Sequence, residues 1–425
     1  MTYSGPDPYP VPSGRRIHGE AAVPPSKSIA HRALILAAMA EGASLVSPLP
    51  EADDVAATRD CLRTLGVRVT PEAGGARVEG VPAGWKPPHG VLRCRASGTT
   101  LRLLAGVCGA QEGTFTLDGD AQLRRRPMAD LARPLSALGV CLRYAERPGH
   151  PPLVVEGRRW AGGTVEVAGS TSSQFLSGLL LGAPRAAAPV AFVARELVSR
   201  PYAWMTAELM ARFGAKVHRP DAATWSVTPA AYRACDVSVE PDTSAAAFLW
   251  AAAAVTDGDV LVKGTAEDSL QGDAVFPDLL ARMGCRVVRT PEGVRVAGRP
   301  GMGLEADVQE TPDLVPALVA TACFAPTPSR LAGVGHLRFK ESDRLSVLAD
   351  AVAALGGTIL LEDDCLTVVP GEDHHGAILD PHGDHRMAMA FAVMGSVIPG
   401  VRITEPSCVA KSFPGFFETL QELCR

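Results

Sequence analysis

The side chains best suited to chemistry in this sequence gather in six short polar clusters, each followed by a run of small and apolar residues. Ser, Thr or Asp opens most of these runs, and the side-chain oxygens of these residues cap the N–H groups of helix starts. A helix start also carries partial positive charge, which suits phosphates and carboxylates. We therefore expect a site for a polyanionic substrate. The clusters are 26–28, 97–99, 170–174, 242–244, 311–313 and 384–386.

Cations accompany the first clusters. Lys27 and Arg32 lie near a predicted helix start, where a cation is poorly placed unless an anion joins it. A solvated first turn explains the same residues, and both interpretations remain open. Arg126 ends a run of three arginines before Pro127, which we expect in the first turn of a helix. A solvated basic loop is the alternative for that run.

Small and hydroxyl residues distinguish two further clusters. Gly98 would let backbone N–H groups approach a ligand closely, although a tight packing turn would use the same residue. Around Ser172, several hydroxyls and Gln174 precede an apolar helix. One hydroxyl suffices as a cap, so the others predict hydrogen bonds to a ligand. Ser199 opens the next amphipathic helix and could add a contact.

Charges of both signs fill 340–344. The simple alternative is an exposed first turn with ion pairs that contribute only tenths of a kcal/mol. Glu341 could exchange protons if it lies among the cations of the other clusters. Asp384 beside His385 invites a metal or triad interpretation. However, the sequence has neither the H-E-x-x-H nor the G-x-S-x-G pattern, so we predict no metal site.

A repeat positions these clusters. Amphipathic stretches end at glycines 66, 139, 214, 284 and 356, which are 73, 75, 70 and 72 residues apart. Glycine just past a helix is a common stop signal. Six copies of about 71 residues would fill the chain, each with a buried helix, an amphipathic helix and short strands. This unit is longer than solenoid repeats, so it predicts a small α/β module.

Composition limits the class of protein. The 425 residues predict two domains, and 47% hydrophobic with 20% charged residues is typical of a globular chain. The longest apolar runs are too short to span a bilayer, and we see no signal peptide. The ten scattered cysteines suggest reduced thiols in the cytoplasm. A net charge of −5 argues against general nucleic-acid binding, whereas basic residues near the clusters would attract a small anion.

Taken in order, eight motifs from Val23 to the C-terminus resemble those of the 5-enolpyruvylshikimate-3-phosphate (EPSP) synthase family of enolpyruvyl transferases. A chance match to all eight in this order is negligible. The motifs are P-x-S-K-S, S-G-T-T-x-R, R-x-R-P, S-x-S-S-Q-F, P-D, K-E-S-D-R, D-H-R-M-A-M and A-K-S-F-P.

The resemblance implies an α/β, two-domain enolpyruvyl transferase fold of six β-α-β-α-β-β units, three per domain. Residues 24–241 would form the shikimate 3-phosphate domain, and 1–23 with 242–425 would complete the phosphoenolpyruvate site. The implied transferase moves the enolpyruvyl group of phosphoenolpyruvate to the 5-hydroxyl of shikimate 3-phosphate and releases phosphate. This step leads to chorismate and aromatic amino acids and is the target of glyphosate. The family uses no cofactor, nucleic acid or membrane, and we expect a cytoplasmic monomer.

The resemblance also implies residue roles. Asp313 would take the proton of the 5-hydroxyl, and Glu341 would protonate the methylene carbon and later remove a proton. His385 would lie beside Glu341 and tune it. The implied catalytic residues are Lys27, Asp313, Glu341 and His385. The implied shikimate 3-phosphate contacts are Lys27, Ser28, Arg32, Ser172, Ser173, Gln174, Ser199, Asp313 and Lys340. The implied phosphoenolpyruvate contacts are Lys27, Gly98, Arg126, Gln174, Arg344, Arg386 and Lys411.

Three positions depart from the family pattern, because Ala96, His31 and His336 stand where asparagine is usual or frequent. We expect His336 to replace the missing amide as a hydrogen-bond donor. The main alternative is UDP-N-acetylglucosamine enolpyruvyl transferase, which carries a reactive cysteine in the region of 115–126, where this chain has none. RNA 3′-terminal phosphate cyclases and a non-catalytic binding paralogue are more distant alternatives.

Overall fold

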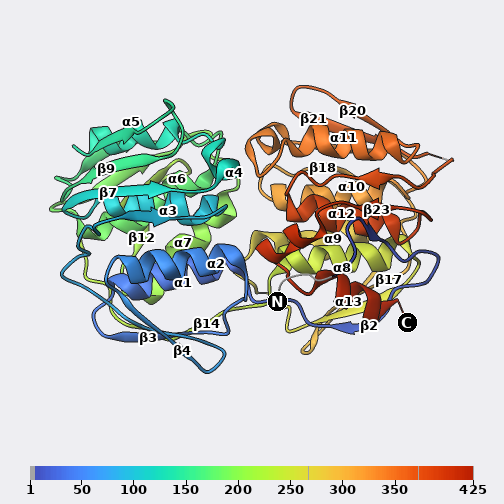
Figure 1. Cartoon of the computed structure of the whole chain (residues 1–425), viewed down its shortest axis with the longest axis horizontal. Helices are drawn as coiled ribbons and strands as arrows, with labels where there is room; N and C mark the ends of the chain where they lie inside the picture. The colour runs from blue at the N-terminus through green and yellow to red at the C-terminus, as the bar shows by residue number, and fades with distance from the viewer. Residues whose placement is uncertain (1–4, 267, 372, 425) are drawn as a thin grey trace. The chain divides into compact units, whose positions relative to one another are not determined.

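A computed structural model describes residues 5–266, 268–371 and 373–424. The chain divides into two compact units, one of Pro25–Val239 and one of Met1–Pro24 with Glu240–Arg425. We call them the α1–α7 unit and the α8–α13 unit after their helices (Figure 1). No helix among the described residues is long and apolar enough to span a membrane.

The α1–α7 unit contains three four-stranded sheets, one for each module. The first is β14 (Val237–Ser238), β3 (Ala43–Ser47), β5 (Gly75–Glu79) and β4 (Arg68–Glu72), in that spatial order. The second is β6 (Val91–Arg93), β7 (Gly113–Asp118), β9 (Leu153–Gly157) and β8 (Cys141–Tyr144). The third is β10 (Gly163–Glu166), β11 (Val190–Val193), β13 (Thr224–Val227) and β12 (Val217–His218).

The α8–α13 unit repeats this plan, with a shorter last sheet. Its first sheet is β16 (Arg286–Thr290), β17 (Gly293–Ala297), β15 (Asp259–Lys263) and β2 (His18–Ala21). Its second is β18 (Glu305–Asp307), β19 (Ser329–Ala332), β21 (Cys365–Val369) and β20 (Thr358–Leu361). Its third is β1 (Tyr9–Pro10), β23 (Arg402–Ile403) and β22 (Ile378–Leu379).

Each sheet combines one parallel pair with antiparallel neighbours. In the third sheet of the α1–α7 unit, β10 pairs parallel with β11, while the β11–β13 and β12–β13 pairs are antiparallel. Two sheets obtain their parallel partner from distant sequence, because β14 pairs with β3 and β2 pairs with β15. The predicted six α/β modules are therefore confirmed, but strands that are distant in the sequence, β14 and β2, complete two of them.

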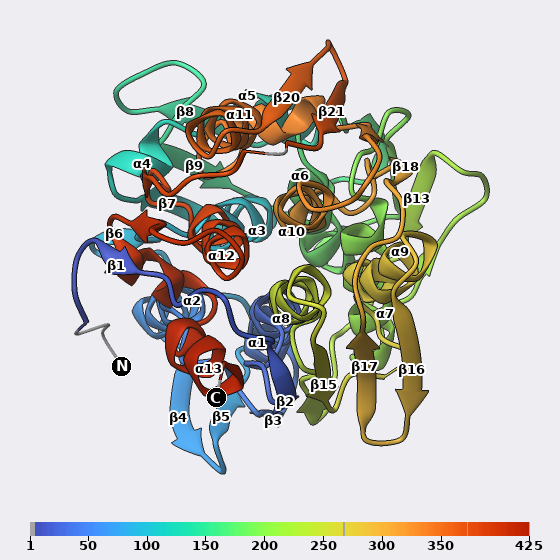
Figure 2. The same cartoon turned by 90° about the vertical axis from the view of Figure 1, so that its right-hand side faces the viewer.

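Each module has one helix that is buried on nearly all sides and one that is buried on one face. The buried helices are α1 (Lys27–Met39), α3 (Gly98–Gly109), α6 (Ser173–Gly182), α8 (Thr243–Val255), α10 (Val315–Ala322) and α12 (His385–Gly395). The partly exposed ones are α2 (Asp53–Thr64), α5 (Ala129–Ala137), α7 (Arg200–Arg212), α9 (Phe276–Arg282), α11 (Arg344–Ala354) and α13 (Phe416–Leu423). Figure 2 shows α8, α10 and α12 nearly end-on, with the sheets of their unit outside them. Helices that are apolar on all sides belong in a core.

Helix boundaries follow the expected signals, with some exceptions. Ser26, Ser97, Ser172, Asp242 and Asp384 cap their helices through side-chain oxygens. The five glycines at 66, 139, 214, 284 and 356 have positive φ angles of 81° to 100°, as the stop signal requires.

A helix starts near Pro127 as expected, but the expectation that the proline lies in its first turn is wrong. The short helix α4 (Ala121–Arg124) precedes it, and α5 begins only at Ala129, with Met128 as N-cap. The cluster at 311–313 also lacks a side-chain cap, and a 3₁₀ turn (Pro312–Leu314) leads into α10 there. Proline supplies the helical φ but no N–H group, so a side-chain cap has less to satisfy at that start.

Candidate active site

The start of α1 holds a buried ion pair. Ser26 accepts a hydrogen bond from the backbone N–H of Ile29 at 3.5 Å, which fixes the first turn. Lys27, 7% exposed, lies 3.0 Å from the carboxylate of the buried Asp54 on α2. A buried pair must be well hydrogen-bonded to offset the loss of hydration. Lys27 is therefore held in one place rather than solvated, which removes the simple surface interpretation of this cluster.

A chain of hydroxyl groups extends from this ion pair across three helices. Thr100 of α3 donates to the backbone carbonyl of Asp54 at 3.3 Å and lies 2.7 Å from the hydroxyl of Thr58. Thr58 in turn lies 2.7 Å from Nδ1 of His31 on α1. Burial lowers the pKa of His31 to about 3, so the ring is neutral at physiological pH. His31 therefore serves as a neutral hydrogen-bonding group behind the helix starts.

Gly98 and Arg126 are in direct contact. A methyl group added at Gly98 would lie 2.3 Å from Nη1 of Arg126 and 2.9 Å from its Cζ. The absence of a side chain at the first residue of α3 thus lets the guanidinium, only 6% exposed, lie over the helix start. The pair brings a fixed cation to a positive helix end, an arrangement that favours an anion there.

Arg102 organises the third cluster, although it was not among the predicted site residues. Its guanidinium donates to Ser172 Oγ at 3.4 Å and to Gln174 Oε1 at 3.1 Å. The Gln174 amide then donates to Thr99 at 3.0 Å. The side chain is 2% exposed and its Cζ lies 4.9 Å from the ring centre of Phe175. Arg102 is the last residue of the S-G-T-T-x-R motif, so its place in the motif was the available signal.

Arg32 joins α1 to α6 and α7. Its nitrogens donate to Thr206 Oγ1 at 2.7 Å, to the Ser28 carbonyl at 2.9 Å and to the Tyr202 carbonyl at 3.2 Å. The residue is 1% exposed, and burial lowers its pKa to about 10. These bonds give Arg32 a structural function. Direct contact of Ser28 and Arg32 with a substrate stays a prediction.

Ser199 has an unusual backbone. It precedes α7 with φ of +54° and is 4% exposed. A non-glycine residue in the left-handed region costs about 1 kcal/mol or more and is frequent at ligand sites. Ser173, at the first turn of α6, is likewise buried. The α1–α7 unit therefore gathers Lys27, Gly98, Arg126, Ser172 and Gln174 at linked helix starts, whereas ligand contacts of Ser173 and Ser199 stay predictions.

In the α8–α13 unit, Asp313 lies among three cations. Its carboxylate is 2.9 Å from Arg344, 3.0 Å from Arg386 and 3.7 Å from Lys340. Burial alone would raise the pKa of Asp313, but the positive charges of Arg386, Lys340 and Arg344 outweigh it and hold the pKa well below the usual value. Asp313 is therefore an anion, and three clusters that are distant in sequence meet around it.

Arg344 is fully buried and connects three carboxylates. Besides Asp313, it contacts Glu341 at 2.9 Å and Asp384 at 2.8 Å. Burial would lower its pKa, but the negative charges of Asp384, Glu341 and Asp313 outweigh burial and raise the pKa above its usual value. Glu341 thus contacts the buried cation of its own cluster, which Arg344 joins to Asp313 and Asp384 of two other clusters. Its predicted role in proton transfer stays a prediction.

The tautomer of His385 follows from its neighbour. Nη1 of Arg386 lies 2.9 Å from Nε2 of the His385 ring, and a guanidinium can only donate. Nε2 therefore accepts, which places the ring proton on Nδ1, 3.7 Å from Oδ1 of Asp384. His385 is fully buried. Its predicted effect on Glu341 stays a prediction, as does the phosphoenolpyruvate contact of the buried Lys411 in the 3₁₀ turn Pro406–Lys411.

Asp273 belongs to this cluster, although no motif pointed to it. It lies in the 3₁₀ turn Gly272–Val275 and accepts a hydrogen bond from Ser244. Burial and the nearby charge of Asp313 raise the pKa of Asp273 to about 7. Only the fold reveals this neighbour of Asp313, because the sequence around Asp273 resembles an ordinary turn.

His336 is buried close to the same charges. It lies in the 3₁₀ turn Gly335–Phe339 and is 6% exposed. Burial, assisted by the positive charge of Lys340, lowers its pKa to about 3. Within the described part of the chain, its Nε2 has no hydrogen-bond partner. Its expected role as a substrate donor stays a prediction. No group of three or more possible metal ligands occurs among the described residues.

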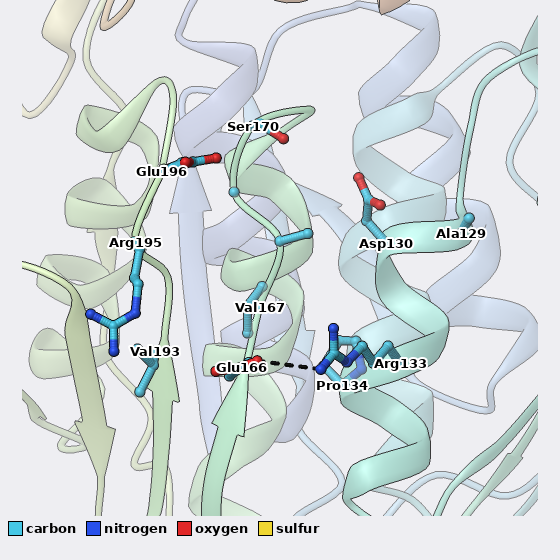
Figure 3. Close-up of a pocket in the computed structure, with 12 residues that line it drawn as sticks. Ala129, Asp130, Arg133, Pro134, Glu166, Val167, Ser170, Val193, Arg195 and Glu196 are labelled. Atoms are coloured by element: carbon cyan, nitrogen blue, oxygen red, sulfur yellow. Dashed lines mark hydrogen bonds and ion pairs between the residues drawn. The ribbon is translucent and has the colours of Figure 1, made fainter.

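A surface pocket beside the third cluster is not the predicted substrate site. Figure 3 shows this cavity of approximately 540 Å³, which Ser170 lines together with Arg133, Glu166, Arg195 and Glu196. Arg133 pairs with Glu166 at 3.3 Å. None of the residues assigned to either substrate lines it. The predicted contacts therefore lie outside this pocket.

Comparisons with known proteins show the family to which the chain belongs. The family model described as EPSP synthase (3-phosphoshikimate 1-carboxyvinyltransferase) matches residues 11–420. The chain belongs to this family. A 3-phosphoshikimate 1-carboxyvinyltransferase of Methanosphaerula palustris is 43% identical over 403 residues, covering 93% of this chain and 95% of the relative. One from Syntrophobacter fumaroxidans is 41% identical, with coverage of 96% and 97%.

Solved structures support the fold. EPSP synthase from Acinetobacter baumannii superposes with a TM-score of 0.81 at 28% identity, covering 97% of both chains. The enolpyruvyl transferase NikO from Streptomyces tendae gives 0.79 at 19% identity, covering 97% of this chain and 96% of NikO, and supports the fold alone. The predicted two-domain enolpyruvyl transferase fold is confirmed. The UDP-N-acetylglucosamine alternative is not favoured, because the matching family model carries the shikimate name.

Proposed function

We propose that this chain transfers the 1-carboxyvinyl group of phosphoenolpyruvate to the 5-hydroxyl of shikimate 3-phosphate and releases inorganic phosphate. The observation that carries this proposal is the cluster of Asp313, Glu341 and Arg344. In it, the buried guanidinium of Arg344 lies 2.9 Å from each of the two carboxylates. Two acid–base groups beside fixed cations are what addition followed by elimination requires.

The first step forms a bond between the 5-oxygen of shikimate 3-phosphate and C2 of phosphoenolpyruvate. We assign removal of the hydroxyl proton to Asp313 and protonation of the methylene carbon to Glu341. In the second step the bond from C2 to the phosphate oxygen breaks, and phosphate leaves with the proton that Asp313 took from the hydroxyl, which restores the Asp313 carboxylate. Glu341 then removes a proton from the new methyl group, which restores the double bond. Atoms and charges balance without an external reductant or oxidant.

The low pKa of Asp313 makes it a weak base while Arg386, Lys340 and Arg344 surround it. Anionic substrates would share these cations through charge-assisted hydrogen bonds and so reduce their hold on Asp313. Substrate binding would thereby raise the pKa of Asp313 toward a value useful for proton removal. Lys27 with Arg126 in one unit, and Arg344 with Arg386 and Lys411 in the other, would neutralise the carboxylate and phosphate groups.

The remaining substrate assignments follow the same division. We assign shikimate 3-phosphate to Ser28, Arg32, Ser172, Ser173, Gln174, Ser199 and Lys340, with Lys27 and Asp313. We assign phosphoenolpyruvate to Gly98, Arg126, Gln174, Arg344, Arg386 and Lys411, with Lys27. Arg102 would position Ser172 and Gln174, because it donates to both. We further propose that the enzyme acts as a cytoplasmic monomer without nucleic-acid or membrane partners.

Phosphate release from the purified chain tests the proposal. We expect release only when shikimate 3-phosphate and phosphoenolpyruvate are both present, with one phosphate per enolpyruvyl group transferred. Release with UDP-N-acetylglucosamine in place of shikimate 3-phosphate would support the alternative transferase. No release with either acceptor, although both substrates bind, would indicate a non-catalytic paralogue and overturn the proposal.

A further inference from the structure

A second cavity lies at the opposite ends of the buried helices of the α1–α7 unit. It has a volume of approximately 790 Å³ and is lined by residues from the ends of α1, α3 and α6, including Met39, Ala110 and Pro184. The candidate active-site residues described above lie at the starts of these helices, so the two sites are separated by the length of the helices. A cavity of this size suits a small organic molecule.

A side chain already donates to one carbonyl near the end of each of these helices. The ring N–H of Trp85 donates to the carbonyl of Ala38 in α1 at 3.2 Å. Trp160 donates in the same way to Gly109 of α3 at 2.8 Å, and the hydroxyl of Tyr232 donates to Leu181 of α6 at 3.0 Å. These three carbonyls therefore do not require a cation from the cavity.

The cavity nevertheless contains three cations, Lys86, Arg159 and Arg185, and one carboxylate, that of Glu112. Arg185 is held by its own bonds to the carbonyls of Pro82 at 2.9 Å and Ala83 at 3.2 Å. Burial and the positive charge of Arg159 lower the pKa of Arg185, and the negative charge of Glu112 offsets them only in part, so the two guanidinium groups still repel each other. An anion between them would relieve this repulsion.

Two buried donors point to the same conclusion. Gln111 is 1% exposed, and its Oε1 accepts from the backbone N–H of Trp85 at 3.1 Å, which fixes the orientation of the amide. The Nε2 group of Gln111 then has no acceptor among the described residues, and neither has the buried Nε of Arg185. Buried N–H groups without an acceptor destabilise a protein, so a ligand that accepts hydrogen bonds from them would be stabilised here.

Two other cavities formed by the described residues lack this combination. The pocket in Figure 3 offsets its two arginines with Asp130, Glu166 and Glu196. The cavity at the ends of α8, α10 and α12 has a single guanidinium, that of Arg299, among mostly apolar residues. We propose that the cavity of Gln111, Arg159 and Arg185 binds a small organic anion, a carboxylate with an apolar body. The carboxylate lies between the guanidinium groups and the apolar body lies against Met39 and the proline side chains.

Isothermal titration calorimetry tests this site with 3-phenylpropionate, its neutral analogue 3-phenyl-1-propanol and inorganic phosphate. We expect saturable binding of 3-phenylpropionate with a dissociation constant of about 1 mM or lower, and binding of the alcohol at least about tenfold weaker. Arg159→Gln removes an exposed cation and should weaken 3-phenylpropionate binding by about tenfold. Gln111→Met removes the buried donor and should weaken it as well.

Two control variants locate the binding. Arg299→Gln alters the corresponding cavity of the other unit, and Arg126→Gln alters the candidate active site. We expect both to bind 3-phenylpropionate like the wild type, whether or not the proposed reaction occurs. The proposal is overturned by an absence of saturable binding up to about 10 mM. It is also overturned if Arg159→Gln has no effect, if Arg126→Gln abolishes binding, or if inorganic phosphate displaces 3-phenylpropionate at equal concentration.

Discussion

At the level of single residues, the contact between Gly98 and Arg126 determines where one cation of the candidate active site lies. Gly98→Ala would place a methyl group 2.3 Å from the guanidinium, whose flexible side chain can move aside without disturbing the fold. Because arginine–carboxylate bonds depend on geometry, we expect the KM for phosphoenolpyruvate to rise and glyphosate inhibition to weaken, each by about tenfold. Steady-state kinetics with varied phosphoenolpyruvate measure both.

The matched control is Gly90→Ala, where an added methyl group would meet nothing within 4 Å. It should leave both constants unchanged. If Gly98→Ala also leaves the KM for phosphoenolpyruvate and the inhibition constant at their wild-type values, Arg126 does not contact phosphoenolpyruvate in the way proposed.

Glu341 offers a second test at this scale. Glu341→Ala should reduce turnover below detection while each substrate still binds within about tenfold of the wild-type affinity, because an acid–base group acts mainly in the transition state. Phosphate release and calorimetry measure the two effects separately. Glu362→Ala removes an exposed carboxylate of the same unit and should change neither. Equal losses of binding and turnover would instead assign Glu341 to holding Arg344, 2.9 Å away, in position.

At the level of helices and strands, the hydrogen-bond chain from His31 joins α1, α2 and α3 and makes stability depend on pH. Burial lowers the pKa of His31 to about 3 from 6.5 in the unfolded chain. Between these values only the unfolded chain takes up the proton, so the free energy of unfolding falls as the pH drops from about 6.5 toward 3. The slope is up to about 1.4 kcal/mol per pH unit for this residue.

We therefore expect His31→Asn to lose less stability than the wild type between pH 6.5 and pH 4.5, although it can be less stable at neutral pH. Urea unfolding at the two pH values measures the difference. Replacing the exposed His218 by asparagine should leave the dependence unchanged. Identical slopes for His31→Asn and the wild type would mean that the folded protein protonates His31 as readily as the unfolded chain does.

The helices show which features the sequence determines locally. Caps such as Ser97 and stop signals such as Gly139 depend on neighbouring residues, so their prediction from sequence was correct. The helix expected near Pro127 does not include the proline in its first turn, because Pro127 lies in the segment between α4 and α5, which the proline rule does not detect. Arg102 and Asp273 were assigned no role because their importance depends on partners that only the fold brings near, such as Gln174 and Asp313.

At the scale of the whole chain, the N-terminal segment belongs to the unit formed by the second half of the sequence. Strand β2 pairs with β15, and Tyr9 packs against Phe417 with ring centres 4.3 Å apart. Ile17 is fully buried there, and its carbonyl accepts from the N–H of Asp259 at 3.0 Å. Periodicity within the sequence predicted six modules but could not show which distant strand completes each sheet.

Ile17→Ala should therefore destabilise the α8–α13 unit, although residue 17 precedes the whole α1–α7 unit in the sequence. Removing a fully buried isoleucine side chain costs about 2 to 5 kcal/mol, which corresponds to about 30-fold or faster hydrogen exchange of amides that open only with the unit. Mass spectrometry should find this acceleration in peptides of α8 and α12 and not in those of α3 and α6. Val288→Ala, in the exposed position of β16, should change neither set. Equal acceleration in both units would mean that they unfold together, and unchanged exchange in α8 would show that the N-terminal segment contributes little to this core.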